Sequence, residues 1–161
     1  MQKFYDLVLE ASKKLRLADH MTYVTYPLLK ETKLLLSIIE SISKSLTISL
    51  DAYLYYDHMY KRISYIPDNL REKLDIFERS SARRYNLQGY SKLILEINEI
   101  LRKHKEAPVS FAKNDKLIIC SQNYKIKTLE VEDAKNYLSK AKPFILRLRN
   151  ILKQEHANKR R

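Results

Sequence analysis

The chain has 161 residues, the length of one domain that can bury a core without disulfides or metals. It is 45% hydrophobic and 31% charged, and its single glycine compares with about eleven in an average composition. Gly-rich phosphate loops, dinucleotide fingerprints and Gly-rich barrels are excluded, because each needs several glycines at fixed positions. The composition therefore predicts a mainly helical protein.

The net charge of +12 is concentrated near the C-terminal end. Residues 135–161 include nine basic residues and one acid, so +8 of the total lies there. This asymmetry favours a polyanionic partner, nucleic acid before anionic lipid, with solubility alone as the alternative explanation. The single cysteine, Cys120, forms neither an intramolecular disulfide nor a cysteine zinc site, which indicates a reducing, cytoplasmic compartment. No run is apolar enough to span a membrane, so no membrane partner is expected.

Hydrophobic spacing predicts the first two of five helices. Apolar residues recur every three or four positions from Phe4 to Ala18, which predicts an amphipathic helix over 2–22. Pro27 suits the first turn of a second helix, whose apolar stripe continues to about residue 63. If unbroken, this second helix would be about 54 Å long.

The middle of the chain combines two further helices with a short β segment. Pro67-Asp68 is expected to end the second helix and cap a third, and a fourth follows Gly89 and stops at Pro108. Over about 109–128 the hydrophobic period becomes two, which predicts a small antiparallel meander. Its turns would use Asn and Asp, and the lack of Gly makes tight primed turns less expected.

The last helix has the most regular heptad, from Ala134 to Leu152 in alternating steps of four and three. Pro143 lies inside it and is expected to bend it. The predicted fold class is mainly α, a five-helix bundle with the β-meander between helices 4 and 5. It forms a single helical domain over 1–157, followed by a basic tail, 158–161, expected to be disordered.

Two histidines, His20 and His58, each follow an aspartate, but the predicted helices keep them apart. If the first two helices are antiparallel, the histidines are separated by about 45 Å along the second helix. They could meet only if that helix folds back or a second subunit brings them together. No metal site and no cofactor are therefore expected.

The basic C-terminal helix is the main candidate nucleic-acid surface, because its side chains can contact phosphates. A second candidate is the segment 80–92 around Gly89, where arginines that can pair with phosphate are interleaved with tyrosines that can stack on bases. The alternative for this segment is a helix–helix corner whose tyrosines pack inward and whose arginines are solvated. The candidate binding residues are Arg83, Arg84, Tyr85, Lys142, Arg147, Arg149, Lys153, Lys159, Arg160 and Arg161.

Arg149-Asn150, with His156 beyond them, resembles the Arg-x(4–6)-His motif of the HEPN superfamily, helical domains that include metal-independent ribonucleases. The resemblance implies that Arg149 holds the scissile phosphate and that His156 assists attack by the ribose 2′-hydroxyl. It also implies that both protomers of a dimer often contribute to the site. A HEPN-like ribonuclease is therefore the enzymatic alternative.

Four stretches carry a second resemblance: ADHMTYVTYPLLKETKLLL, RRYNL, KEAPVSF and LIICSQNYKIKTL. Spread over residues 17 to about 145, they resemble a family of small archaeal proteins of no known activity, which implies an intracellular helical protein. The function predicted from sequence is non-enzymatic binding of RNA or a ribonucleoprotein by residues 135–161. The alternatives are the ribonuclease and a dimerisation or scaffold protein, a homodimer through helices 2 and 5.

Overall fold

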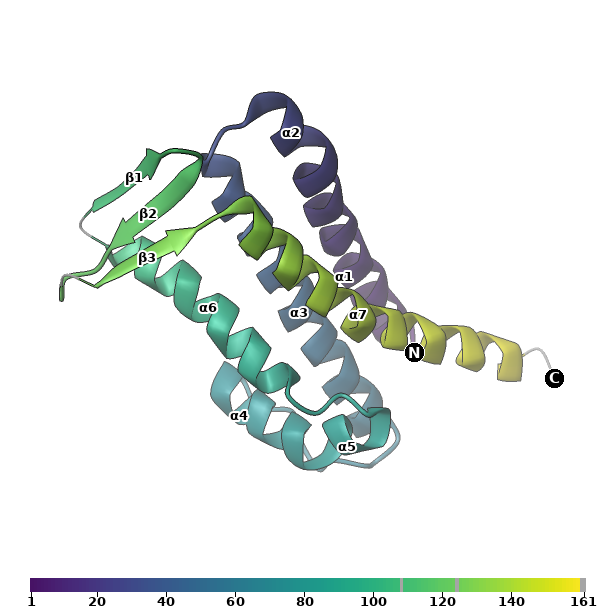
Figure 1. Cartoon of the computed structure of the whole chain (residues 1–161). Helices are drawn as coiled ribbons and strands as arrows, with labels where there is room; N and C mark the ends of the chain where they lie inside the picture. The colour runs from purple at the N-terminus through teal and green to yellow at the C-terminus, as the bar shows by residue number, and fades with distance from the viewer. Residues whose placement is uncertain (108, 124, 160–161) are drawn as a thin grey trace.

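A computed structural model describes residues 1–107, 109–123 and 125–159. In these residues, five helical runs and one three-stranded antiparallel sheet build a mainly α fold (Figure 1). The sheet lies in the chain between α6 (Tyr90–Glu106) and α7 (Val131–Lys159). The predicted helical bundle with a meander between its fourth and fifth helices is confirmed.

The first helical run is longer than its apolar spacing predicted. Helix α1 (Gln2–His20) continues through a π-helical turn, η1 (Met21–Thr25), into α2 (Tyr26–Leu29). The prediction that Pro27 begins the second helix is wrong, because Pro27 lies in the first turn of α2, inside this run. A proline lacks a backbone N–H, and the wider π turn directly before it accommodates that loss. The run ends at Lys30, whose φ of 49° is left-handed.

Helix α3 (Lys33–Met59) is the central element of the core. Its 27 residues make it about 40 Å long, shorter than predicted, since it begins later and ends at Met59. It packs against α1, α6 and α7, and Figure 1 shows it between the α1–α7 pair and α6. Its remaining solvent face is polar, with Ser37, Glu40 and Lys44 exposed. Its fully buried apolar residues include Leu35, Ile38, Ile39, Ile42, Leu46, Leu50, Tyr53 and Leu54.

The third run consists of α4 (Leu70–Ile76), a π turn, η2 (Phe77–Ser81), and α5 (Ala82–Tyr85). Its N-cap is Asn69 rather than the predicted Asp68, since the Asn69 side chain accepts a hydrogen bond from the Glu72 N–H at 2.9 Å. The left-handed residue Asn86 ends the run. Gly89 then precedes α6 with a φ of 90°, a conformation that other residues rarely adopt.

The sheet is a meander of β1 (Val109–Lys113), β2 (Lys116–Cys120) and β3 (Ile126–Leu129), in the spatial order β1-β2-β3. Phe111 pairs with Ile118, and Ile118 pairs with Thr128. The expectation that tight turns are disfavoured is wrong for the first hairpin. Asn114 and Asp115 both have positive φ, 50° and 61°, because their short polar side chains tolerate the left-handed region that Gly usually supplies.

Helix α7 covers the core with the predicted apolar heptad, and its buried residues include Ala134, Leu138, Ala141, Ile145 and Leu148. Pro143 lies inside the helix and removes a backbone donor. Nearby, the Tyr90 hydroxyl of α6 donates to the Lys140 carbonyl at 2.9 Å. Helix α7 also includes Asn158 and Lys159, which the sequence assigned to a tail, whereas Arg160 and Arg161 lie outside the described residues. In the described part of the chain, no helix combines the length and apolar character needed to cross a bilayer.

Candidate nucleic-acid interface

Four basic side chains form a line along one side of α7. Lys135, Lys142 and Arg149 are separated by seven residues each, nearly two full turns, so they project from the same side of the helix. Lys153 continues the line one turn beyond Arg149. These four residues, here called the basic stripe, extend over about 27 Å.

Helix α1 lies antiparallel to α7 beside this stripe. Near one end the Lys142 ammonium pairs with the Asp19 carboxylate at 2.7 Å, and near the other the rings of Tyr5 and His156 are 6.1 Å apart. Between the helices lies a pocket of about 670 Å³, here called the α1–α7 groove. It is lined by Ser12, Leu15, Arg16, Asp19, His20 and Val24 from α1 and η1, and by Ser139, Lys142, Pro143, Ile145, Leu146 and Arg149 from α7.

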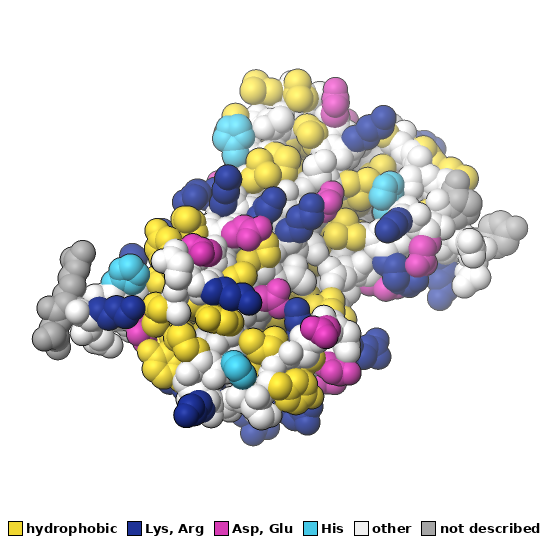
Figure 2. Space-filling view, turned by 180° about the vertical axis from the view of Figure 1, so that it is seen from behind, with side chains coloured by type: hydrophobic (Ala, Val, Ile, Leu, Met, Phe, Trp, Pro, Cys, Tyr) yellow, Lys and Arg dark blue, Asp and Glu magenta, His cyan; other side chains and the backbone are white. Residues whose placement is uncertain are grey.

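The groove combines apolar and cationic side chains. Leu146 is 53% exposed and Val24 is 46% exposed, so the groove offers apolar surface to solvent. Arg16 and Arg149 line the same pocket and are also exposed. Figure 2, which views the α1 side of the molecule, shows hydrophobic, basic and acidic side chains intermixed over this face. Such a surface can contact both a charged backbone and an apolar or aromatic group.

The residues predicted to bind phosphate on α7 fall into two groups. Lys142, Arg149 and Lys153 belong to the basic stripe. Arg147 lies on another side of α7, seven residues from Lys140, so the helix does not present all its basic residues together. Lys159 lines a small pocket with Met1, Gln2, Tyr5 and His156 at the far end of the helix pair, and Arg160 and Arg161 fall outside the described residues.

The arginine and tyrosine corner has a mainly structural role. Arg83 is exposed, but Arg84 donates from Nη1 to Oδ2 of Asp57 at 2.8 Å. Tyr85 is buried, and its hydroxyl donates to Oδ1 of Asp57 at 2.6 Å. Burial and the bond to Asp57 raise the pKa of Tyr85, so the phenol keeps the proton that it donates. Since a buried ring offers no face to a base, the stacking role predicted for Tyr85 is withdrawn, and the inward-packed alternative describes this tyrosine.

Asp57 is the centre of this corner. It is fully buried, with 0% of its surface exposed, yet four donors surround its carboxylate. Besides Arg84 and Tyr85, Ser81 Oγ donates at 2.5 Å and Arg62 Nη1 donates at 3.2 Å. A buried carboxylate is tolerated only with such pairing. Asp57 therefore joins α3 to the loop after it, to η2 and to α5.

A neighbouring network fixes the end of α7. The Glu155 carboxylate accepts hydrogen bonds from the hydroxyls of Tyr56 at 2.6 Å and Tyr60 at 3.0 Å. The Arg62 guanidinium lies over both rings, 5.5 Å and 5.0 Å from their centroids. Burial, and then the bond to Glu155, raise the pKa of Tyr56. These contacts hold the helical turns that carry Lys153 and His156 against α3.

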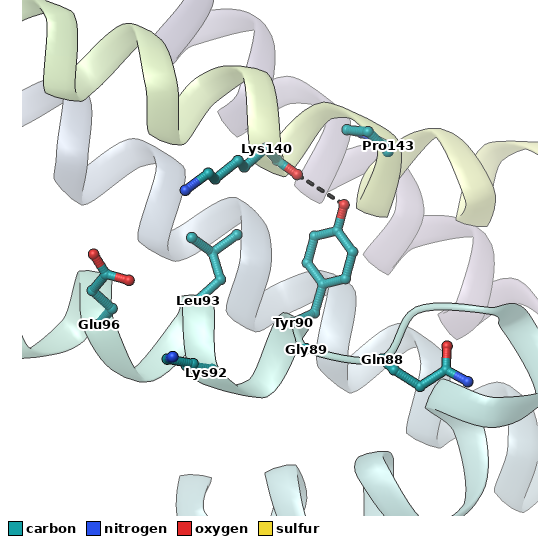
Figure 3. Close-up of a pocket in the computed structure, with 8 residues that line it drawn as sticks. All are labelled: Gln88, Gly89, Tyr90, Lys92, Leu93, Glu96, Lys140 and Pro143. Atoms are coloured by element: carbon teal, nitrogen blue, oxygen red, sulfur yellow. Dashed lines mark hydrogen bonds between the residues drawn. The ribbon is translucent and has the colours of Figure 1, made fainter.

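Another pocket, of about 400 Å³, lies beside the single glycine. Figure 3 shows Tyr90 reaching from the start of α6 to the Lys140 carbonyl, with Lys92 and Lys140 on opposite walls. Nothing lies within 4 Å of a Cβ built on Gly89, so its positive φ, not a lack of space, requires glycine. The Tyr90 side chain lines this pocket, and its bond links α6 to α7.

The two residues of the HEPN-like pair share one side of α7 but not one pocket. Arg149 and His156 are seven residues apart, about 10.5 Å along the helix. Arg149 lines the α1–α7 groove, whereas His156 lines a separate pocket of about 330 Å³ beside Tyr5. His20 and His58 end antiparallel helices and lie apart. Within the described ranges, no group of three or more His, Cys, Asp or Glu residues is placed to hold a metal ion.

The α1 side of the groove was not predicted from the sequence. Tyr5, Leu9 and Arg16 recur at helical spacing and are exposed beside the buried stripe of α1, to which Ser12 belongs. The spacing of these α1 residues is visible in the sequence, but which helix packs beside them depends on the tertiary structure. Comparison of the chain with protein-family models, curated proteins and solved structures finds no match. The charge and shape of the α1–α7 face are therefore the basis for assigning a function.

Proposed function

We propose that this protein is a non-enzymatic RNA-binding module whose contact surface is the basic stripe of α7. The observation that carries the proposal is the alignment of Lys135, Lys142, Arg149 and Lys153 on one side of a well-packed helix. Because the helix that carries these cations is already ordered, they can contact several phosphates of one strand without a loss of backbone entropy on binding.

Two members of the stripe are the most available for phosphate. Lys142 is paired with Asp19 and Lys135 with Glu132. Arg149 and Lys153 are exposed, and within the described part of the chain neither forms an ion pair. A guanidinium or ammonium group that is not paired with a protein carboxylate can pair with an RNA phosphate. Pairing releases the counterions bound to the two groups, and this release makes the affinity salt-dependent. These two residues are therefore the best test positions.

Neutralising both residues is expected to weaken RNA binding and to flatten its salt dependence. For Arg149→Gln/Lys153→Gln, the slope of log affinity against log salt should fall by about 1.4, or about 0.7 for each lost contact to a single strand. Fluorescence anisotropy with a labelled RNA at several salt concentrations measures this slope. The matched control is Arg71→Gln/Lys105→Gln, which removes the same charge from exposed positions on α4 and α6.

The control separates a local contact from a general charge effect. The proposal requires the control variant to keep the wild-type slope. If the salt-dependence slope falls by the same amount in both double variants, the protein attracts RNA only through its net charge and the stripe has no special role. If the wild type shows no salt-dependent binding to any RNA, the proposed function itself is wrong.

A second candidate function, metal-independent RNA cleavage, is favoured by one observation: Arg149 and His156 are exposed on the same side of α7. Their separate pockets favour binding without cleavage. We therefore expect an RNA incubated with the wild type in EDTA to remain intact, as it does with His156→Ala. Gel electrophoresis of end-labelled RNA over time measures this. Cleavage by the wild type that His156→Ala abolishes would establish the ribonuclease instead.

A further inference from the structure

We infer that the α1–α7 groove and the surface at its two ends bind single-stranded RNA in preference to duplex RNA, by stacking bases on Tyr23 and Tyr5, which lie outside the pocket itself. This inference rests on the proposed function, since it assigns the substrate class of the same surface. It is carried by two exposed aromatic rings that α1 and η1 place beside the basic stripe.

Tyr23 combines a base platform with phosphate contacts. It lies in η1 and is 51% exposed. The Lys135 and Lys142 ammonium groups lie 5.7 Å and 5.8 Å from its ring centroid. Because both ammonium groups lie over the ring, a base that stacks there displaces them from the ring face, and the phosphate of the same nucleotide can then pair with them in place of Glu132 and Asp19. Aromatic rings beside cations are the usual components of single-strand sites, because every base has a face that can stack.

Tyr5 provides a second ring at the other end of the helix pair. It is 37% exposed, and its ring lies 6.1 Å from that of His156. It shares a pocket with Lys153, so a cation again adjoins the aromatic surface. Tyr5 and Tyr23 are 18 residues apart, about 27 Å along the helix. At about 3.4 Å per phosphate, the spacing of a fully stacked strand, that length corresponds to at most about eight nucleotides, and to fewer when the bases turn toward the protein.

The surface between the two tyrosines suits unpaired bases. Leu9 and Leu146 are both about half exposed there, at 49% and 53%. In an RNA duplex the bases are stacked inside and phosphates and riboses cover the outside, so exposed leucines would face only polar groups. A single strand can turn its bases toward the leucines and tyrosines while its phosphates face Arg16, Arg149 and Lys153.

Oligonucleotide length and strandedness test the inference directly. By anisotropy, a labelled single-stranded uridine 12-mer is expected to bind the wild type at least about tenfold more tightly than a 12-base-pair RNA duplex. Affinity for uridine oligomers should rise up to about eight nucleotides and then level off. A deoxyuridine 12-mer shows whether the ribose contributes, and equal binding would extend the ligand class to single-stranded DNA.

Tyrosine substitutions identify the stacking platforms. Tyr23→Ala and Tyr5→Ala are each expected to weaken single-strand binding about five- to a hundredfold, whereas Tyr23→Phe keeps the wild-type affinity because it retains the ring. Tyr65→Ala is the matched control, since Tyr65 is also exposed but lies in the loop between α3 and α4. The chain contains no tryptophan, so Tyr23→Trp introduces a single reporter whose fluorescence a stacked base should quench.

The outcomes distinguish the inference from the function on which it rests. If Arg149→Gln/Lys153→Gln weakens binding but Tyr23→Ala and Tyr5→Ala behave like Tyr65→Ala, the protein binds RNA without stacking and the inference is wrong. Equal affinity for duplex and single strand would also overturn it. The wild type could instead be a dimer that binds no oligonucleotide and that Leu9→Lys converts to a monomer. That result would assign the groove to a second copy of the chain.

Discussion

Asp57→Asn is expected to lower the free energy of unfolding by about 3–5 kcal/mol, a large part of the total for a domain of this size. The substitution keeps the shape of the side chain but removes the charge that Arg62 and Arg84 share. It also leaves Ser81 and Tyr85, which both donate to Asp57, with a poorer acceptor. Urea denaturation followed by circular dichroism measures the loss as a lower midpoint at an unchanged m-value.

The control for this variant lies on the same helix, six residues earlier. Asp51 pairs with Lys73 at 2.8 Å, but the Asp51 side chain is 40% exposed, so solvent screens the pair. Asp51→Asn should therefore cost no more than about 1 kcal/mol. Equal losses for the two variants would mean that the buried network contributes no more than a surface ion pair, and that the hydrophobic packing of the corner holds it together.

The second large effect is a loss of stability in alkali. Burial raises the pKa of Tyr53 and of Tyr85 above the ordinary value of 10.0. Each phenol therefore keeps its proton in the folded chain at a pH where the unfolded chain has released it. The stabilisation is fully present below pH 10 and declines as the pH rises above it. The loss should be about 1.4 kcal/mol per pH unit for each tyrosine.

Urea titrations between about pH 9 and pH 11 test this slope, with tyrosinate absorbance reporting the ionisation that accompanies unfolding. Tyr53→Phe is expected to reduce the slope above pH 10 by about 1.4 kcal/mol per unit. A free energy of unfolding that stays constant up to pH 11 would show that the buried phenols do not control alkaline stability.

The helices could be predicted from the sequence because each has one apolar side that must be buried. The spacing of Phe4 and Val8, or of Leu138 and Ile145, indicates that side without knowledge of the fold. Their ends were harder to place. Pro27 is equally compatible with the first turn of a new helix and with a turn that follows a π segment. The local sequence does not distinguish these, and packing decides between them.

Only part of the candidate site could be predicted from the sequence. The basic C-terminal helix could be predicted, because charge is a property of one segment, but the candidate set left out Lys135 and included Arg147, which lies on another side of α7. The opposite wall could not, since Arg16 and Tyr23 gain significance only when α1 packs beside α7. The role of Asp57 was equally hidden: its partners Ser81, Arg84 and Tyr85 lie 24 to 28 residues further along the chain.

The antiparallel pairing of α1 and α7 has a consequence for folding. The two walls of the groove come from segments separated by more than a hundred residues, so their contacts have a high contact order and a large loop-closure cost. During synthesis, a chain whose α7 has not yet been made can form α1 and α3. Such a chain has only one wall of the groove. Single-strand binding should therefore emerge late in folding, after the helical core is formed.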